Sequence, residues 1–228
     1  MNGEQVTFEQ DGKSYQGYLS IPSTGSDPGV IVIQEWWGIV EHIKDVCDRF
    51  AAAGYVALAP DFYDGKSTAE PDEAGSLMMA LNIEDAARVI QGATSALLEN
   101  PATRGDSVGV VGFCMGGQLS MFAASIDNRI AACVNFYGVH PNVQIDFNKG
   151  VAPILGLFAE HDDYASPAAV KELAIEMDKA GKPYAFRTYP GTHHAFFNDD
   201  RPEVYCQEAA EDAWARVLAF FAETIGRP

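Results

Sequence analysis

Short apolar runs alternate with segments of helical periodicity along most of this 228-residue chain, and that alternation constrains its fold more than any other feature. Segments 5–8 and 14–21, joined at Asp11-Gly12, predict an antiparallel hairpin. Further strands are predicted at 29–33, 55–59, 108–111, 131–136, 154–158 and 184–189. Most of these runs are too apolar to leave one face in water. The sequence therefore predicts an α/β fold, with a mostly parallel twisted sheet of about eight strands and helices on both faces.

Helix boundaries are marked by capping residues. Gly54 is placed to end the helix that follows the strand at 29–33, because glycine adopts the left-handed conformation at little cost. Ser166 is a good cap, and Pro167 suits the first position of a helix that Gly181 closes. A last long helix is expected from about residue 203 to about residue 225.

Only the stretch at about 61–81 departs from this scheme. It contains Gly65, Pro71 and Gly75 and shows no clear helical period. An insertion between strands of an open α/β sheet lies where loops gather at the carboxyl edge, which is where ligands bind. Two interpretations of this stretch stay open: it forms a small cap over a site, or it is a surface loop without a functional role. Because no repeat or linker is present, a single domain over 1–228 is expected.

Composition restricts the partners of the chain. A formal net charge of −17 argues against nucleic acid and anionic membranes, since both bind basic surfaces. The first residues lack the pattern of a secretory leader, and no apolar run approaches a membrane span, so a cytoplasmic location is expected. The cysteines are widely spaced with no CxxC pair, which favours reduced thiols. No metal and no cofactor are expected, and the oligomeric state is left open, a homodimer included.

Residues 112–116 form a Gly-x-Cys-x-Gly motif between an apolar run and a probable helix. Such a strand-to-helix turn presents its central side chain, here Cys114, at the carboxyl end of a sheet. The positive end of the following helix favours a thiolate and offers N–H groups to an oxyanion. A buried structural cysteine in a glycine-rich turn is the alternative interpretation.

A thiol nucleophile needs a base and an acid that orients the base. The strand at 154–158 is followed by Asp162 and Asp163, and the strand at 184–189 is followed by His193 and His194. Nucleophile, acid and base thus come in the order Cys, Asp, His, each after a predicted strand and at the same sheet edge. That order is hard to obtain by coincidence, so a catalytic triad is predicted.

Five motifs together resemble the dienelactone hydrolase family, cysteine hydrolases of the α/β-hydrolase fold. They are VIQEWWG at 32–38, GYVALAPD at 54–61, GFCMGG at 112–117, FAEHD at 158–162 and HAFFN at 194–198. The resemblance implies that Cys114 is the nucleophile, Asp162 the acid and His194 the base. Asp163 and His193 remain the alternatives to their neighbours.

The resemblance also gives a role to the residues after the strand at 29–33. Glu35 corresponds to a glutamate that contacts the resting thiol and is displaced by substrate; a strand-end acid that faces water is the alternative. The backbone N–H groups of Trp36 and Met115 correspond to the donors of the oxyanion hole. The implied reaction is acyl transfer from a lactone or activated ester to sulfur, followed by hydrolysis of the thioester.

The chain departs from the family where substrate is bound. Asn198 stands four residues after the triad histidine, where the family carries an arginine that grips a dianionic substrate, and Arg201 is the nearest arginine that follows. We therefore expect a less anionic small-molecule lactone or ester. Aromatic residues are candidates to line the pocket, each weighed against a place in the core: Trp36, Trp37, Tyr63 and Tyr137.

Two rival functions were weighed. Class I glutamine amidotransferases also use Gly-x-Cys-x-Gly, but they need His-Pro-Glu, whereas here His140-Pro141 is followed by Asn142. The second rival is a protein on a hydrolase scaffold that binds or senses through Cys114 without turnover. The sequence leaves that alternative open.

Overall fold

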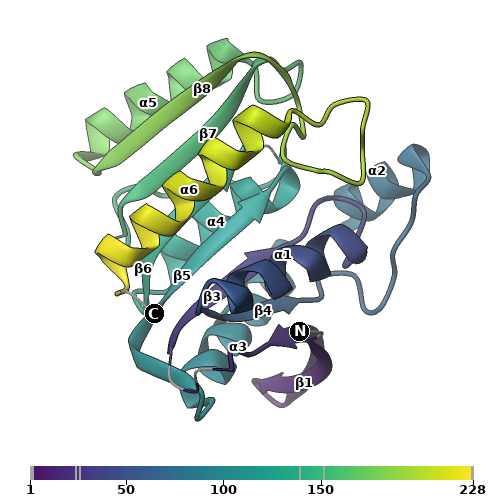
Figure 1. Ribbon diagram of the computed structural model, residues 1–228, viewed down its shortest axis with the longest axis vertical. Coiled ribbons are helices and arrows are strands. Elements are labelled where there is room, and N and C mark those ends of the chain that lie inside the picture. The colour runs from purple at the N-terminus through teal and green to yellow at the C-terminus, as the bar shows by residue number, and fades with distance from the viewer. Residues whose placement is uncertain (1–2, 24, 26, 139, 151, 227–228) are drawn as a thin grey trace.

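The computed structural model describes residues 3–23, 25, 27–138, 140–150 and 152–226. Its strands are β1 Glu4–Gln10, β2 Lys13–Ser20, β3 Asp27–Ile33, β4 Val56–Pro60, β5 Thr103–Phe113, β6 Ile130–Phe136, β7 Ile154–His161 and β8 Tyr184–His193. Its helices are α1 Glu41–Ala52, α2 Pro71–Ala80, α3 Ile83–Glu99, α4 Met115–Ile126, α5 Pro167–Ala180 and α6 Gln207–Thr224 (Figure 1).

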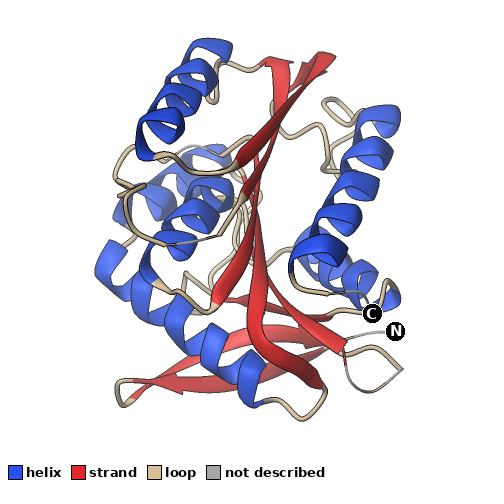
Figure 2. Ribbon diagram, turned by 90° about the vertical axis from the view of Figure 1, so that its left-hand side faces the viewer, coloured by secondary structure: helices blue, strands red, loops and turns tan. Residues whose placement is uncertain are grey.

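One sheet organises the molecule, with strand order β1-β2-β4-β3-β5-β6-β7-β8. The hairpin of β1 and β2 is antiparallel and pairs with β4, and all later neighbours are parallel. The sheet twists between two layers of helices (Figure 2). The predicted α/β architecture and the opening hairpin are thus confirmed.

Each face of the sheet buries its own apolar core. Helices α1 and α6 pack on one face, around Phe50 and Phe221, and helices α3 and α4 pack on the other, around Ile90 and Leu119. Alternate residues of β3 serve the two cores, because successive side chains of a strand point to opposite faces: Val30 and Val32 to the first, Ile31 and Ile33 to the second. This two-sided burial explains why the strand sequences are continuously apolar.

The stretch at 61–81, which showed no helical period, contains helix α2. Pro71 begins the helix, at a position where a missing N–H is harmless. Ala74 is the one buried residue of α2, so no apolar stripe marks it in the sequence. The His140 imidazole lies 3.2 Å from the Met78 carbonyl oxygen, which ties the end of α2 to the segment after β6.

The last helix begins at Gln207, later than the expected start near 203, because residues 202–204 form a turn and 205–206 are irregular. No helix in the described part of the chain is both long and apolar enough to cross a membrane.

The turn between β5 and α4 is the tightest contact of the fold. Cys114 has φ 54° and ψ −120°, a conformation that non-glycine residues rarely adopt. A Cβ on Gly112 would overlap the Gly116 carbonyl. A Cβ on Gly116 would lie 2.5 Å from the carbonyl oxygens of both Ile33 and Gln34. Both glycines are therefore required for the first turn of α4 to lie against the end of β5 and the backbone at the end of β3.

We predict that Gly116→Ala destabilises the protein by about 1–3 kcal/mol, because the added methyl group meets backbone that cannot move aside. Gly75→Ala is the matched control, since its Cβ would meet only a Trp36 ring carbon at 3.9 Å in the middle of α2. That control should be neutral or stabilising by up to about 1 kcal/mol. Urea unfolding of both variants measures the effect. Equal stabilities of Gly116→Ala and the wild type would contradict this account of the turn.

Candidate active site

Three loops at the carboxyl edge of the sheet bring Cys114, Asp162 and His194 together. Cys114 is half-buried and precedes the first residue of α4. Its backbone N–H donates to the Phe136 carbonyl at 3.0 Å, and its own carbonyl accepts from Gly117 at 2.9 Å. These bonds hold the strained turn, so the thiol is fixed at the amino end of α4.

Asp162 orients His194 directly. Oδ2 of Asp162 lies 2.8 Å from Nδ1 of His194. The other carboxylate oxygen accepts hydrogen bonds from the backbone N–H groups of Tyr164 at 2.8 Å and Ala165 at 2.9 Å. Asp162 is only 4% exposed, so its carboxylate is desolvated and depends on these three partners. Both Asp162 oxygens are thereby fixed, and so is the plane of the imidazole.

The neighbouring acid and histidine lie elsewhere. Asp163 and His193 are exposed and lie at the rim of the cleft described below. The His193 ring lies against the His161 ring, with centroids 5.5 Å apart, and not against a carboxylate. Of the two pairs left open by the sequence, the structure brings Asp162 and His194 into contact.

The second ring nitrogen of His194 is not used by Asp162, and Cys114 lies close enough to act on the ring. Nε2 is buried and has no hydrogen bond of normal geometry within the described residues. Burial alone would lower the pKa of His194, but the hydrogen bond to Asp162 and the interaction with Cys114 outweigh it and raise the pKa to about 10. The imidazolium form is therefore stabilised by Asp162 and, when the Cys114 sulfur carries a negative charge, by that sulfur as well.

Glu35 lies at the base of the same cleft. It is 1% exposed, which excludes the alternative of an acid that faces water. The Asn198 side-chain N–H₂ donates to its Oε2 at 2.7 Å, and Asn198 is itself 2% exposed. Asn198, which the sequence suggested as a substrate-binding residue, therefore holds a buried carboxylate and does not reach the cleft surface.

Two backbone N–H groups have no acceptor here. Met115 is the first residue of α4, so its N–H has no partner within the helix. Trp36 follows the end of β3, and neither amide donates a hydrogen bond to any residue that the structure describes. Free backbone N–H groups near a nucleophile can donate hydrogen bonds to an oxyanion.

A cleft of about 540 Å³ opens above these groups. Its lining includes three residues that the sequence suggested for the pocket: Trp36, Trp37 and Arg201. The Arg201 guanidinium lies 5.7 Å from the Trp37 ring centre and forms a 2.9 Å ion pair with Glu203. Its charge is thus partly neutralised. Apolar and aromatic side chains form much of the remaining wall: Pro71, Met78, Pro141, Tyr164, Ala195 and Val204.

Tyr63 and Tyr137, which the sequence suggested as lining residues, are buried below the cleft surface. The Tyr63 hydroxyl donates to the Met115 sulfur at 3.2 Å. Conversely, the sequence reasoning missed Tyr164, which is 60% exposed and whose ring centre lies 5.0 Å from that of His194. Its place two residues after the triad acid was the available signal.

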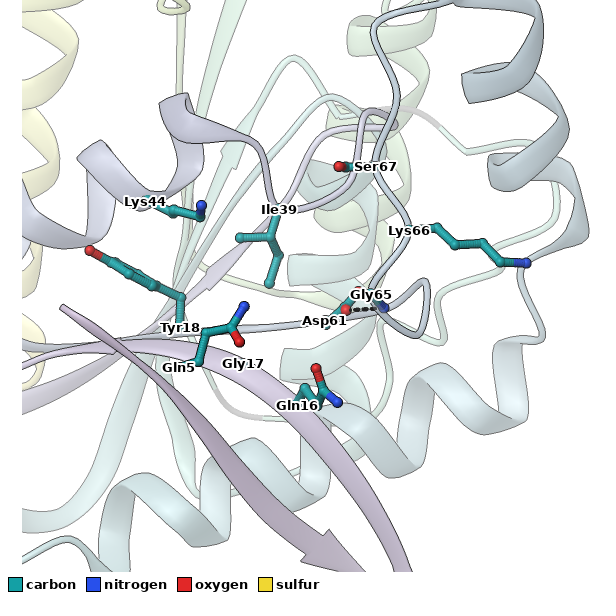
Figure 3. A pocket seen from close by; sticks show the side chains of 10 residues that line it. All are labelled: Gln5, Gln16, Gly17, Tyr18, Ile39, Lys44, Asp61, Gly65, Lys66 and Ser67. Carbon is teal, nitrogen blue, oxygen red and sulfur yellow. Dashed lines mark hydrogen bonds between the residues drawn. The ribbon is translucent and has the colours of Figure 1, made fainter.

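A second hollow lies between the β1-β2 hairpin and residues 61–67 (Figure 3). The Asp61 carboxylate inside it is held by the backbone N–H groups of Tyr63 and Gly65. Figure 3 shows the Lys66 side chain pointing away from the hollow. Neither a cysteine nor a histidine is among the described residues that line it. Within the described residues, no group of three or more His, Cys, Asp or Glu side chains could hold a metal ion.

Comparison with known proteins gives a consistent result. The profile of the dienelactone hydrolase family matches residues 15–225. Protein usf of Aquifex pyrophilus is 40% identical over 230 residues, which is 98% of this chain and 99% of that protein. A protein of Aquifex aeolicus (strain VF5), provisionally named carboxymethylenebutenolidase, is 35% identical over 226 residues, covering 96% and 97% of the two chains.

Solved structures agree. The crystal structure of a protein from Klebsiella pneumoniae, provisionally named dienelactone hydrolase, superposes with a TM-score of 0.84 at 28% identity over 97% of this chain and 98% of that one. The dienelactone hydrolase-like promiscuous phosphotriesterase P91, from metagenomic libraries, superposes with a TM-score of 0.88 at 22% identity, over 98% of each chain. With a family match over nearly its whole length, this chain belongs to the dienelactone hydrolase family of hydrolases.

Proposed function

We propose that the protein is a carboxylic ester hydrolase that opens a lactone or an activated ester through a Cys114-His194-Asp162 triad and a thioester intermediate. One observation carries the proposal: Asp162 holds His194 at 2.8 Å, while the other ring nitrogen is buried without a hydrogen-bond partner among the described residues, and Cys114 lies close enough to raise the pKa of His194. A base oriented on one side and free on the other is the arrangement that activates a nucleophile.

In the first half-reaction the Cys114 proton moves to Nε2 of His194, and the sulfur bonds to the substrate carbonyl carbon. The oxyanion accepts hydrogen bonds from the amides of Trp36 and Met115. When the carbonyl re-forms, the carbon–oxygen bond to the leaving group breaks and the alkoxide takes the proton from His194. In a lactone this alcohol stays attached to the acyl group. The product is a thioester on Cys114.

In the second half-reaction His194 must be neutral. Acylation removes the charge of Cys114, which is one of the causes that raise the pKa of His194. The imidazole, which has given its proton to the leaving alkoxide, therefore stays neutral and can take a proton from water, which attacks the thioester carbon. The carbon–sulfur bond breaks, the acid product leaves, and the sulfur takes the proton from His194, which restores the starting thiol and imidazole. The same nitrogen thus serves as acid and base in turn.

The cleft supports a substrate that is neutral and partly apolar. Its walls are largely aromatic and aliphatic, and Arg201 shares its charge with Glu203. The net charge of −17 gives no long-range attraction for a dianion. Thiolates are good leaving groups as well as good nucleophiles, so lactones and enol esters suit this site better than amides.

Exchange of the triad residues should separate the two histidines and the two acids. We expect Cys114→Ala and His194→Ala to lower kcat/KM for a p-nitrophenyl ester by more than about 10³-fold. His193→Ala and Asp163→Ala serve as matched controls and should retain most of the activity, because neither side chain contacts the triad. Loss of activity in His193→Ala, with His194→Ala active, would reverse the assignment. No turnover by the wild type over a panel of esters and lactones would favour the sensor function.

The pKa of His194 should depend on the sulfur. In Cys114→Ala we expect the pKa of His194 to fall from about 10 by about 1–3 units, since an interaction that favours the charged form is removed. NMR titration of the imidazole signals measures it, with the exposed His193 as an internal control. An unchanged pKa of His194 in the variant would show that the sulfur and the imidazole do not interact.

Substrate charge should matter in a defined direction. We expect kcat/KM for an aryl ester of a neutral acyl group to exceed that for the matching ester with a free carboxylate by about tenfold or more, because the cleft offers no unpaired cation. If Arg201 instead grips a carboxylate, the charged ester becomes the better substrate and Arg201→Gln removes its advantage. Steady-state kinetics with both esters decides between these outcomes.

A further inference from the structure

Tyr137 occupies a strained position beside the nucleophile. It directly follows β6 and has φ 39°, which is costly for a residue with a side chain. Its N–H donates to the Leu157 carbonyl at 2.9 Å, and the N–H of Gly138 donates to the Asn135 side chain at 2.6 Å. The preceding carbonyl, that of Phe136, accepts the N–H of Cys114. The backbone thus over-determines where the Tyr137 ring lies relative to Cys114.

The Tyr137 side chain brings a polar group into the buried floor of the site. The residue is 0% exposed, and its ring centre lies 5.0 Å from that of His194. Its hydroxyl has no hydrogen bond of normal geometry with any described residue. A buried hydroxyl without a partner costs roughly 1–3 kcal/mol. A group kept at such a cost, at a strained position, calls for a functional explanation.

Acidic groups lie close enough to the hydroxyl to act on its pKa. Burial raises the pKa of Tyr137 well above its ordinary value, and the nearby acidic groups Glu35, Cys114 and Asp162 act in the same direction. The hydroxyl therefore keeps its proton and is a donor. The Phe197 backbone N–H lowers the pKa of Tyr137, because it acts on the hydroxyl oxygen. The hydroxyl proton is not used in that interaction and stays free for another acceptor. Glu35 already accepts a hydrogen bond from Asn198 through one oxygen.

We propose that Tyr137 is a further catalytic residue, whose hydroxyl donates a hydrogen bond to the Cys114 sulfur once the thiol has lost its proton to His194. A neutral thiol is a poor acceptor, so the hydroxyl is unpartnered in the resting site; a thiolate is a strong one. The proposal rests on the proposed function of Cys114 as nucleophile. Tyr63 is not an equivalent donor, because its hydroxyl is already bonded to the Met115 sulfur.

The test is the pH dependence of Cys114 alkylation by iodoacetamide in Tyr137→Phe, a variant that keeps the ring and its packing. Mass spectrometry of the peptide that contains Cys114 follows the reaction, since Cys206 is also half-buried. We expect the alkylation profile to move to higher pH by about one unit, so that the rate on its rising limb falls about tenfold. Tyr55→Phe is the matched control, a buried tyrosine whose pKa is raised by burial alone. An unchanged profile in Tyr137→Phe, with wild-type thermal stability, would overturn the proposal.

A second experiment, in the Glu35→Gln variant, tests whether the Tyr137 hydroxyl acts on the Cys114 sulfur directly or through Glu35. The substitution is repeated in Glu35→Gln, which removes the carboxylate that acts most strongly on the hydroxyl after burial itself. If the shift persists, the hydroxyl acts on the sulfur itself. If the shift disappears, the hydroxyl acts through Glu35 and the proposed bond is refuted. Because alkylation needs no turnover, a wild-type protein that hydrolyses no ester would refute the proposed function and leave this test intact.

Discussion

The hydrogen bond between Asp162 and His194 is the interaction on which the chemistry of this site depends. It joins the ends of β7 and β8 across 2.8 Å, and two backbone N–H groups hold the second carboxylate oxygen in place. With Nδ1 committed to Asp162, only Nε2 is left for the nucleophile. The imidazole is thus oriented before any substrate arrives, which reduces the entropic cost of reaching a reactive geometry.

The nucleophile is positioned by backbone rather than by side chains. Glycine at 112 and 116 lets α4 begin in contact with the carbonyl groups after β3, and the positive φ of Cys114 turns the thiol toward the base. Around it, the buried carboxylate of Glu35 and the buried hydroxyl of Tyr137 are kept without full solvation. Such groups cost folding free energy unless a folded-state partner satisfies them, as Asn198 does for one oxygen of Glu35, and a group left without a partner indicates a functional role. The site therefore concentrates strain and desolvation around a single sulfur.

Much of this arrangement follows from the sequence alone. The strands were predictable because burial on two faces makes them continuously apolar, and the turn at Cys114 was predictable because only glycine permits its close contacts. Helix α2 was not, since it buries only Ala74 and so has no apolar stripe. The bond between Asn198 and Glu35 links residues 163 positions apart, and no local pattern announces it. Tyr63 and Tyr137 are buried below the cleft because of how they pack against distant residues. The residue type alone does not tell a buried aromatic side chain from one that lines a pocket.

The most direct measurement of the central claim is mass spectrometry of the protein quenched in acid during turnover of an activated ester. The account predicts one acyl group on the peptide that contains Cys114, lost with time as the thioester hydrolyses, and no such adduct in Cys114→Ala. Turnover with the acyl group on another residue, or turnover that persists in Cys114→Ala, would contradict it.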